Sequence, residues 1–360
     1  MRVFSLLQGV LGALVVVFTG CEVAADALAQ QRAMVDETVA LYGTTTKRLL
    51  YPIKKIKSVY GIVDSTGRRV DYKEGVDYVQ DGEGIRRTSG SAIYDFNNYV
   101  ATYKPDGKFT WVDTPRNPPF TLFLQVFVDY VADIPVVNIP ALAQGPINRR
   151  VVLGGDSVAG GTDTISSSVR SSTDDSWIGL ISKYFNTKFA IQGLGINGAS
   201  ITSLLTILPS VLSDPPGLFI IAFGMNDHSE MNQPTDVNNF KDKLRSVIDQ
   251  CQAAGVPVLV VGFPAENPDW ENFSLERTLL YNQAEQDVAA EKGVPFVDVY
   301  SPFEQVKTRK ELIDFFGDNY HHPGNFGQRI YFSKMLPYLL STPVSSADVP
   351  EFVVVPGSGP

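Results

Sequence analysis

The chain has 360 residues, of which 44% are hydrophobic and 19% charged, and its formal net charge is -9. This composition supplies a hydrophobic core of native size and excludes a disordered chain or a collagen-like fibre. The acidic excess repels phosphate backbones, so we expect no nucleic-acid partner. Two cysteines and three histidines provide neither a disulfide scaffold nor a four-thiolate zinc site. The length favours two domains, or one large domain with an elaborated extension.

Residues 1–29 have the pattern of an export signal. Arg2 precedes an apolar run from Val3 to Phe18, which is short for a membrane span and long enough for the core of a signal peptide. Two processing sites compete, because Cys21 closes a sequence resembling a bacterial lipoprotein box, while residues 27–29 have the small-x-small form of signal-peptidase cleavage. An uncleaved membrane anchor or a buried helix is the alternative. We expect export to the periplasm, the medium or the cell surface, with membrane contact only through a lipid on Cys21.

Residues 30–147 are predicted to form a small β-rich module and a linker. Short apolar and aromatic runs separated by turn residues predict strands at 58–63, 76–79, 108–112 and 121–131. Within the last run, residues 122–128 are apolar almost throughout, which is typical of a strand buried on both faces. Three prolines between residues 132 and 148 interrupt any helix or ladder and predict the linker.

Residues 148–342 alternate strand-like runs with helical patterns, which predicts an α/β domain with a doubly wound parallel sheet of the flavodoxin-like kind. The strands are expected at 150–153, 188–192, 218–223, 256–261 and 295–299. A helix at 238–254 carries Cys251 on its apolar stripe, so this thiol is expected to be buried and inert. The next helix is striped by Leu280, Ala284 and Val288. Residues 343–360 are assigned to a C-terminal tail.

Two short motifs follow predicted strands, at the edge where parallel sheets bind ligands. In Gly154–Val158, Ser157 follows two glycines, so its hydroxyl would lie at the open rim, where a nucleophile is needed. The same string is also typical of a helix N-cap or a turn. In Gly224–Asp227, the Asn226 side chain can donate a hydrogen bond to an oxyanion, although the isolated string is more often a turn.

A third motif, Asp318–Gly324, lies in a loop before a predicted helix. A carboxylate three or four residues ahead of an imidazole can curl back to orient the ring, while the other ring nitrogen faces a serine. Both His321 and His322 lie close enough to Asp318 for this role. The remaining histidine, His228, is expected at the rim of the site or behind the reacting side chains.

The three motifs in this order resemble the SGNH, or GDSL-type, hydrolase family over residues 149–340. The resemblance implies that Ser157 is the nucleophile and that Asp318 orients a histidine base. Family members commonly place a histidine-proline pair three residues after the acid. Here His322 precedes Pro323 but lies four residues after Asp318, whereas His321 has the spacing without the proline. We prefer His322, because a bulge can absorb one extra loop residue, and keep His321 as the alternative.

The resemblance also implies an oxyanion hole made of the Ser157 backbone N–H, a glycine N–H and the Asn226 side chain. The glycine block resembles residues 193–200, in which Gly198 takes the oxyanion position, although the family usually has asparagine at position 193. This block formally matches a dinucleotide-binding fingerprint, but its candidate ribose-binding acid, Asp214, would lie at the wrong end of the sheet. We expect no cofactor. We also expect no metal, because two adjacent histidines lack the spacing of a metal pair.

These roles imply two-step acyl transfer on a carboxylic ester of a small molecule or a polysaccharide. An exported enzyme with an added β-rich module resembles the family's carbohydrate esterases, so removal of O-acetyl groups from a glycan is the leading hypothesis. A lysophospholipase or short-chain lipase is the enzymatic alternative. A different class of function is a glycan-binding surface protein that has lost catalytic activity. The presence of every catalytic residue type argues against it.

Overall fold

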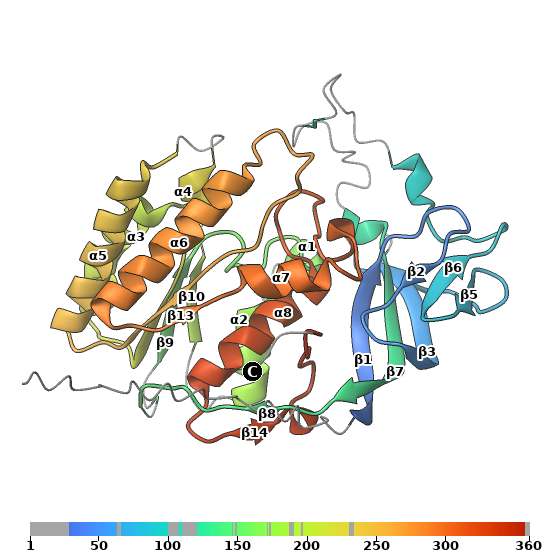
Figure 1. The fold of residues 1–360 in the computed structure, drawn as a ribbon, viewed down its shortest axis with the longest axis horizontal. Helices are drawn as coiled ribbons and strands as arrows, with labels where there is room; N and C mark the ends of the chain where they lie inside the picture. Colours follow the sequence, from blue (N-terminus) through green and yellow to red (C-terminus); the bar gives the residue numbers. More distant parts are fainter. Residues whose placement is uncertain are drawn as a thin grey trace, which may run out of the picture.

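The computed structural model describes residues 29–62, 66–99, 108–109, 121–145, 147, 150–170, 172, 174–186, 191–195, 197–229 and 234–356. The expected export signal with Cys21 lies outside the described residues, as does most of the strand expected at 108–112. No helix in the described part of the chain combines the length and the hydrophobicity needed to span a bilayer. Figure 1 shows a parallel sheet between two groups of helices, and an antiparallel sheet beyond one group.

The parallel sheet has the strand order β10-β9-β11-β12-β13, which is the flavodoxin-like order 2-1-3-4-5. Its strands are β9 (Val151–Gly155), β10 (Ile191–Gly195), β11 (Leu218–Ala222), β12 (Val258–Val261) and β13 (Phe296–Val297). The five predicted strands are thus present with displaced ends, and residues 188–190 lie outside the described part. The strand order reverses at β9, so the carboxyl ends of β9 and β11 flank the crevice where such sheets bind ligands.

β9 continues through Gly154 and Gly155, which the sequence analysis wrongly placed in the turn after the strand. Both glycines have a packing reason to be strand residues. A Cβ on Gly154 would lie 2.7 Å from a methyl carbon of Leu204, and one on Gly155 would overlap Ala159. The absence of side chains therefore lets a helix and the following turn lie directly against the strand end.

The helices alternate with the strands as expected for a doubly wound fold. They are α1 (Ile165–Arg170), α2 (Trp177–Phe185), α3 (Ile201–Leu212), α4 (Met225–His228), α5 (Val237–Ala253), α6 (Leu275–Lys292), α7 (Tyr300–Val306) and α8 (Asn325–Met335). In Figure 1, α3, α5 and α6 lie on one side of the sheet, and α2, α7 and α8 on the other.

The apolar stripes of α5 and α6 test two predictions. Cys251 of α5 is fully buried as expected, and burial raises the pKa of its thiol to about 12, so it stays protonated. The stripe predicted for α6 is wrong at one position, because Leu280 is 45% exposed. Tyr281 takes its place in the core with Ala284 and Val288, which shifts the buried face by one residue while keeping the helical spacing.

The N-terminal part forms two antiparallel sheets. One has the order β1-β7-β3-β4 and the other β2-β6-β5. Their strands are β1 (Ala29–Val39), β2 (Lys47–Arg48), β3 (Ile53–Ile62), β4 (Arg69–Asp71), β5 (Tyr78–Asp81), β6 (Gly84–Arg87) and β7 (Val126–Pro135). The long buried strand predicted at 122–128 is partly wrong, since residues Thr121–Phe123 form a 3-10 turn and the strand begins at Val126.

The expected linker and tail are paired with each other. β8 (Asn138–Ile139) lies in the proline-rich segment and pairs with β14 (Val344–Ser345), which follows the 3-10 turn at Leu336–Leu339 in the α/β part. One hydrophobic cluster runs through both sheets and includes Val128 of β7 and Val152 of β9. The domain boundaries at residues 147 and 342 stay predictions, but the two parts share a continuous core.

A buried ion pair joins the first strand to the α/β part. Lys310 donates to Glu37 of β1 at 2.7 Å, and both side chains are fully buried. Glu37 also accepts hydrogen bonds from the Tyr130 hydroxyl at 2.6 Å and from the Leu50 backbone N–H at 2.8 Å. Such a pair stabilises only while all partners are present, because a single buried charge is costly.

We predict that Lys310→Met lowers the free energy of unfolding by about 3–5 kcal/mol, since it leaves the Glu37 carboxylate buried without its cation. The matched control is Lys307→Met, which removes a partly exposed pair with Glu304 and should cost about 0–1 kcal/mol. Urea unfolding followed by circular dichroism measures both. Equal losses in the two variants would contradict the assigned role of the buried pair.

Candidate active site

Ser157 lies in a tight turn at the carboxyl end of β9 and is 5% exposed. The turn is held by its own backbone and by Asp156. The Asp156 side chain accepts a hydrogen bond from the Val158 N–H at 2.9 Å, and the Ser157 carbonyl accepts one from the Thr162 N–H at 3.0 Å. The serine hydroxyl is therefore fixed at the rim of the sheet, as the first motif predicted.

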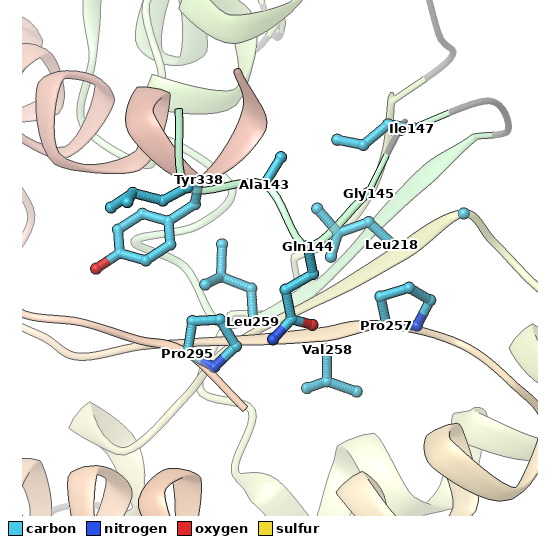
Figure 2. Close-up of a pocket in the computed structure, with 12 residues that line it drawn as sticks. Ala143, Gln144, Gly145, Ile147, Leu218, Pro257, Val258, Leu259, Pro295 and Tyr338 are labelled. Carbon is cyan, nitrogen blue, oxygen red and sulfur yellow. The ribbon is translucent and has the colours of Figure 1, made fainter. Parts of the chain in front are cut away.

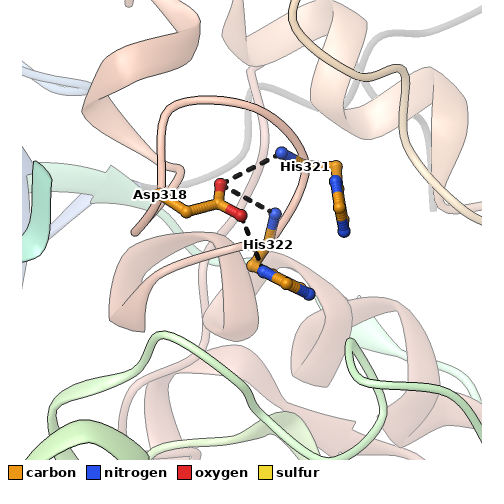
Figure 3. Close-up of side chains that lie close together, drawn as sticks. All are labelled: Asp318, His321 and His322. Atoms are coloured by element: carbon orange, nitrogen blue, oxygen red, sulfur yellow. Dashed lines mark hydrogen bonds and ion pairs between the residues drawn. The ribbon is translucent and has the colours of Figure 1, made fainter. Parts of the chain in front are cut away.

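The loop between residues 318 and 322 curls around one carboxylate. Asp318 Oδ1 accepts hydrogen bonds from three successive backbone N–H groups, those of Tyr320, His321 and His322, at 2.9 to 3.1 Å. Asn319 adopts a left-handed φ of 68°, which tightens the turn. Figure 3 shows the resulting curl and the His322 ring beside the same carboxylate. The four-residue spacing of Asp318 and His322 is thus compatible with contact between them.

The loop brings His322, and not His321, to the serine. His322 Nε2 lies 2.9 Å from Ser157 Oγ, across 165 positions of sequence. On the other side of the ring, His322 Nδ1 lies 2.6 Å from Asp318 Oδ2. His321 turns its ring toward Trp270, with ring centroids 5.1 Å apart. The side chains proposed as nucleophile, base and orienting acid therefore lie in one chain of contacts.

A second carboxylate approaches the same imidazole. Asp163 Oδ2 also lies 2.6 Å from His322 Nδ1. Asp163 follows the Ser157 turn and is buried. The sequence did not point to Asp163, because an aspartate shortly after Gly160 and Gly161 has the composition of an ordinary turn. No local signal distinguishes it from a turn residue, and only its contact with the ring reveals it.

The two neighbouring histidines have opposite electrostatic surroundings. Burial works to lower the pKa of His322, but the charges of Asp318 and then Asp163 outweigh it and raise this pKa to about 10. Burial and, next, the positive charge of His322 lower the pKa of His321 to about 3. His321 is therefore held neutral, whereas His322 is held ready to carry a positive charge.

The two other candidates for oxyanion donors lie beside the serine turn. Asn226, in the α4 turn after β11, donates to the Ala199 carbonyl at 3.1 Å and lies 3.4 Å from Asp156 Oδ2. It thus connects the residue before Ser157 with the residue after Gly198. Gly198 has a φ of 71°, in the region that favours glycine, and a Cβ there would meet nothing within 4 Å. The glycine block itself begins inside β10, since Gly193 and Gly195 are strand residues.

His228 is buried, which agrees with the expected place behind the reacting side chains and not with the rim. Its ring stacks on Phe263 at 5.2 Å, and Nε2 lies 3.7 Å from Glu266 Oε1. Burial, followed by the charge of Arg277, lowers the pKa of His228 to about 4. Burial, followed by the charge of Asp318, raises the pKa of Glu266 well above its usual value. Both groups are therefore held neutral behind the loop, and the sequence offered no sign of Glu266.

Asp318, His321 and His322 present side-chain atoms within 4.8 Å of one another, which is a spacing that a metal ion could use. In this structure, however, both ring nitrogens of His322 already face other groups, Ser157 on one side and two carboxylates on the other. A metal would have to displace one of these contacts. The donor set fits an oriented base better than a metal centre.

A pocket at the other end of the sheet is unrelated to these residues. Figure 2 shows it lined by Leu218, Val258 and Pro295, at the amino ends of β11, β12 and β13. Parallel sheets of this kind bind ligands at the carboxyl ends of their strands. The candidate site is therefore the Ser157 edge.

Comparisons with known proteins found one matching family and several similar solved structures. Residues 153–330 match the GDSL-like lipase/acylhydrolase family. A lipase/acylhydrolase from Enterococcus faecalis is 22% identical, with a TM-score of 0.44 over 52% of this chain and 93% of that chain. An acetyl xylan esterase is 22% identical, with a TM-score of 0.43 over 53% of this chain and 100% of that chain. An acetylxylan esterase from Geobacillus stearothermophilus, solved as a catalytic mutant, is 16% identical, with a TM-score of 0.45 over 55% and 96%. No curated protein matches the chain.

The opposite surroundings of the histidines predict three distinct titrations. In protein labelled with ¹⁵N-histidine, the His322 ring should keep its second proton at neutral pH and lose it near pH 10, because two carboxylates stabilise the imidazolium. The rings of His228 and His321 should stay neutral down to about pH 4 and about pH 3. NMR of the ring nitrogens measures this, and His322→Ala assigns the resonance. Three titrations near the usual histidine value would contradict the electrostatic picture.

Proposed function

We propose a substrate and a mechanism for a chain whose residues 153–330 belong to the GDSL-like lipase/acylhydrolase family and which is therefore a carboxylic ester hydrolase. The enzyme removes O-acetyl groups from a carbohydrate through an acyl-enzyme on Ser157. We further propose that it acts after export, because the first residues have the composition of a signal peptide.

One contact carries the mechanistic proposal. The Ser157 hydroxyl lies 2.9 Å from His322 Nε2, and the far side of that ring lies 2.6 Å from Asp318. A serine is a weak nucleophile until a base accepts its proton, and a carboxylate behind the ring stabilises the imidazolium that forms. The three side chains supply these roles in the order that acyl transfer requires.

In the first step, Ser157 Oγ attacks the ester carbonyl while its proton passes to His322 Nε2. The oxyanion is held by the backbone N–H groups of Ser157 and Gly198 and by the Asn226 amide. Loss of one such donor typically costs about 3 kcal/mol in activation free energy. The imidazolium then gives the proton to the alkoxide oxygen as the bond to the carbonyl carbon breaks. The alcohol departs, and the acyl group remains bound to Ser157.

In the second step, His322 accepts a proton from water, whose oxygen attacks the acyl-enzyme. The tetrahedral intermediate collapses, Ser157 recovers its proton from His322, and a carboxylic acid is released. Across the two steps one ester and one water molecule give one alcohol and one carboxylic acid, and Ser157 and His322 return to their starting protonation states.

Two features support a carbohydrate as the alcohol. Tyr320 is partly exposed, lies 5.9 Å from the His322 ring between centroids, and packs against Trp270. An aromatic side chain with a polar tip beside the base offers an apolar platform and a hydrogen-bonding group, which together suit the faces and edges of a sugar ring. The net charge of -9 opposes attraction to an anionic lipid surface.

We predict that a fluorophosphonate probe labels the native protein and that Ser157→Ala abolishes labelling. His322→Ala should lower labelling and ester hydrolysis by about 10⁴-fold or more, since the serine loses its base. His321→Ala serves as the matched control and should retain most of the activity, because its ring does not contact Ser157. Mass spectrometry locates the label. A folded native protein that fails to react would favour a binding protein instead, and equal losses in the two histidine variants would contradict the assignment.

We predict that acetylated xylan and acetylated xylo-oligosaccharides lose acetate at a higher kcat/KM than lysophospholipid releases fatty acid. The physical reason is the aromatic and polar surroundings of the base, which match a sugar better than a lipid interface. Acetate release and fatty-acid release are measured with the same enzyme preparation, and Ser157→Ala gives the background. Preference for lysophospholipid would remove the carbohydrate proposal while leaving the serine mechanism intact.

A further inference from the structure

We propose that Asp163 is a second positioning acid for His322, so that the imidazole is held between two carboxylates rather than behind one. The inference rests on the proposed function, because it concerns the base of that reaction. Asp163 Oδ2 and Asp318 Oδ2 each lie 2.6 Å from His322 Nδ1. The two acids are far apart in the sequence: Asp163 follows the Ser157 turn, and Asp318 lies in the loop before α8.

Both acids approach the same ring nitrogen. The two distances are short enough for charge-assisted hydrogen bonds, and the side-chain hydrogen bonds of both acids help to raise the pKa of His322. The proton on Nδ1 is therefore shared by Asp163 and Asp318, and both contacts hold the tautomer that leaves Nε2 free to face Ser157.

The hydrogen bonds of the two acids differ. Asp318 has a structural task, because its Oδ1 accepts three backbone N–H groups while its Oδ2 contacts the ring. Among the residues that the structure describes, the Asp163 carboxylate makes no hydrogen bond to backbone and contacts the His322 ring. A buried carboxylate would be costly in such a place without a positive partner. The positive charge of the His322 imidazolium offsets this cost, which explains why the Asp163 carboxylate can be buried there.

The backbone is arranged to bring Asp163 to the ring. Its φ is 63°, in the left-handed region that most side chains avoid and that Asp and Asn tolerate. Gly317 lies directly against it, since a Cβ on Gly317 would overlap the Asp163 carbonyl oxygen. Ile165, two residues later, donates its N–H to Asn325 Oδ1 at 2.9 Å. The serine turn and the histidine loop are thus locked together at this point.

Several other polar groups also face His322, and none replaces Asp163. The ring of His321 lies 4.1 Å away between centroids and is held neutral. Asp156, beside Ser157, interacts with His322 through space, and burial raises its pKa to about 6. The facing groups are, from its own loop, Asp318, Tyr320 and His321, and, from the turn after β9, Asp156, Ser157 and Asp163.

A second acid has two opposing effects on the reaction. It stabilises the imidazolium that forms when Nε2 takes the Ser157 proton, which lowers the barrier. It also raises the pH at which free His322 becomes the neutral base, because a proton on Nε2 is harder to remove between two carboxylates. The Nδ1 proton stays on nitrogen throughout. We therefore expect kcat/KM to be high at alkaline pH and to fall as the pH decreases.

The test is the pH dependence of kcat/KM for Asp163→Asn with p-nitrophenyl acetate as the probe. Asparagine keeps the volume and tolerates the left-handed backbone, so the substitution removes chiefly the charge. The acid limb should move to lower pH by about 1 unit or more, since one of the two charges that stabilise imidazolium is gone. The plateau at alkaline pH should fall by about 10-fold or more, because the imidazolium in the transition state loses the same partner.

The matched control is Asp175→Asn. Asp175 accepts a hydrogen bond from the Ser166 N–H at 2.9 Å in the same segment and is not among the groups that contact His322. In Asp175→Asn, the acid limb of the kcat/KM profile should stay at the pH found for the native protein. An unmoved limb in Asp163→Asn, with only a lower melting temperature, would overturn the proposal in favour of a structural role. An equal shift in both variants would also overturn it, because the shift would then report net charge rather than contact.

A second readout does not depend on activity. The ¹⁵N titration of the His322 ring should move to lower pH in Asp163→Asn and stay unchanged in Asp175→Asn. If the native protein neither hydrolyses esters nor reacts with fluorophosphonate, the proposed function fails, while the ring titration still decides whether Asp163 holds His322. A His322 titration that Asp163→Asn leaves unmoved would refute the second acid even in an active esterase.

Discussion

The site depends on one buried imidazole that must meet a hydroxyl on one side and carboxylate charge on the other. Burial alone would lower the pKa of the His322 ring and keep it neutral, and it would not fix the rotation of the ring. The contacts with Ser157, Asp318 and Asp163 instead fix its rotation and favour its charged form. Because these partners come from two segments far apart in sequence, the chemistry exists only while the turn after β9 and the loop before α8 stay together.

The N-terminal sheets contribute to holding that loop. Leu122 donates its N–H to the Gly317 carbonyl at 3.1 Å, and the Gln125 side chain donates to the Phe316 carbonyl at 2.9 Å. On the same side, the Ala40 N–H donates to Asp314 Oδ1 at 2.8 Å. These bonds join segments next to β1 and β7 to the residues just before Asp318. The N-terminal part therefore contacts the segment that leads into the histidine loop.

Neighbouring residues acquire opposite properties from this arrangement. His321 and His322 are adjacent and equally buried, yet one faces an aromatic ring and the other faces two acids. Local charge decides the protonation of each, because burial acts on both in the same direction. The division leaves the His322 imidazole charged beside its acids, while its neighbour packs as an uncharged ring.

Local signals in the sequence predicted the class of fold and named candidates for the site. Strand-like runs alternating with helical stripes predicted the parallel sheet, and three motifs at its expected edge named Ser157, Asn226 and Asp318 as candidates, because strand ends and polar residues are local signals. The choice between His321 and His322 needed the curl of the loop, in which Asn319 takes a left-handed turn. Asp163 and Glu266 lay beyond prediction, because their contacts join residues distant in sequence. The tertiary structure decided these points, since only packing sets which ring and which carboxylate meet.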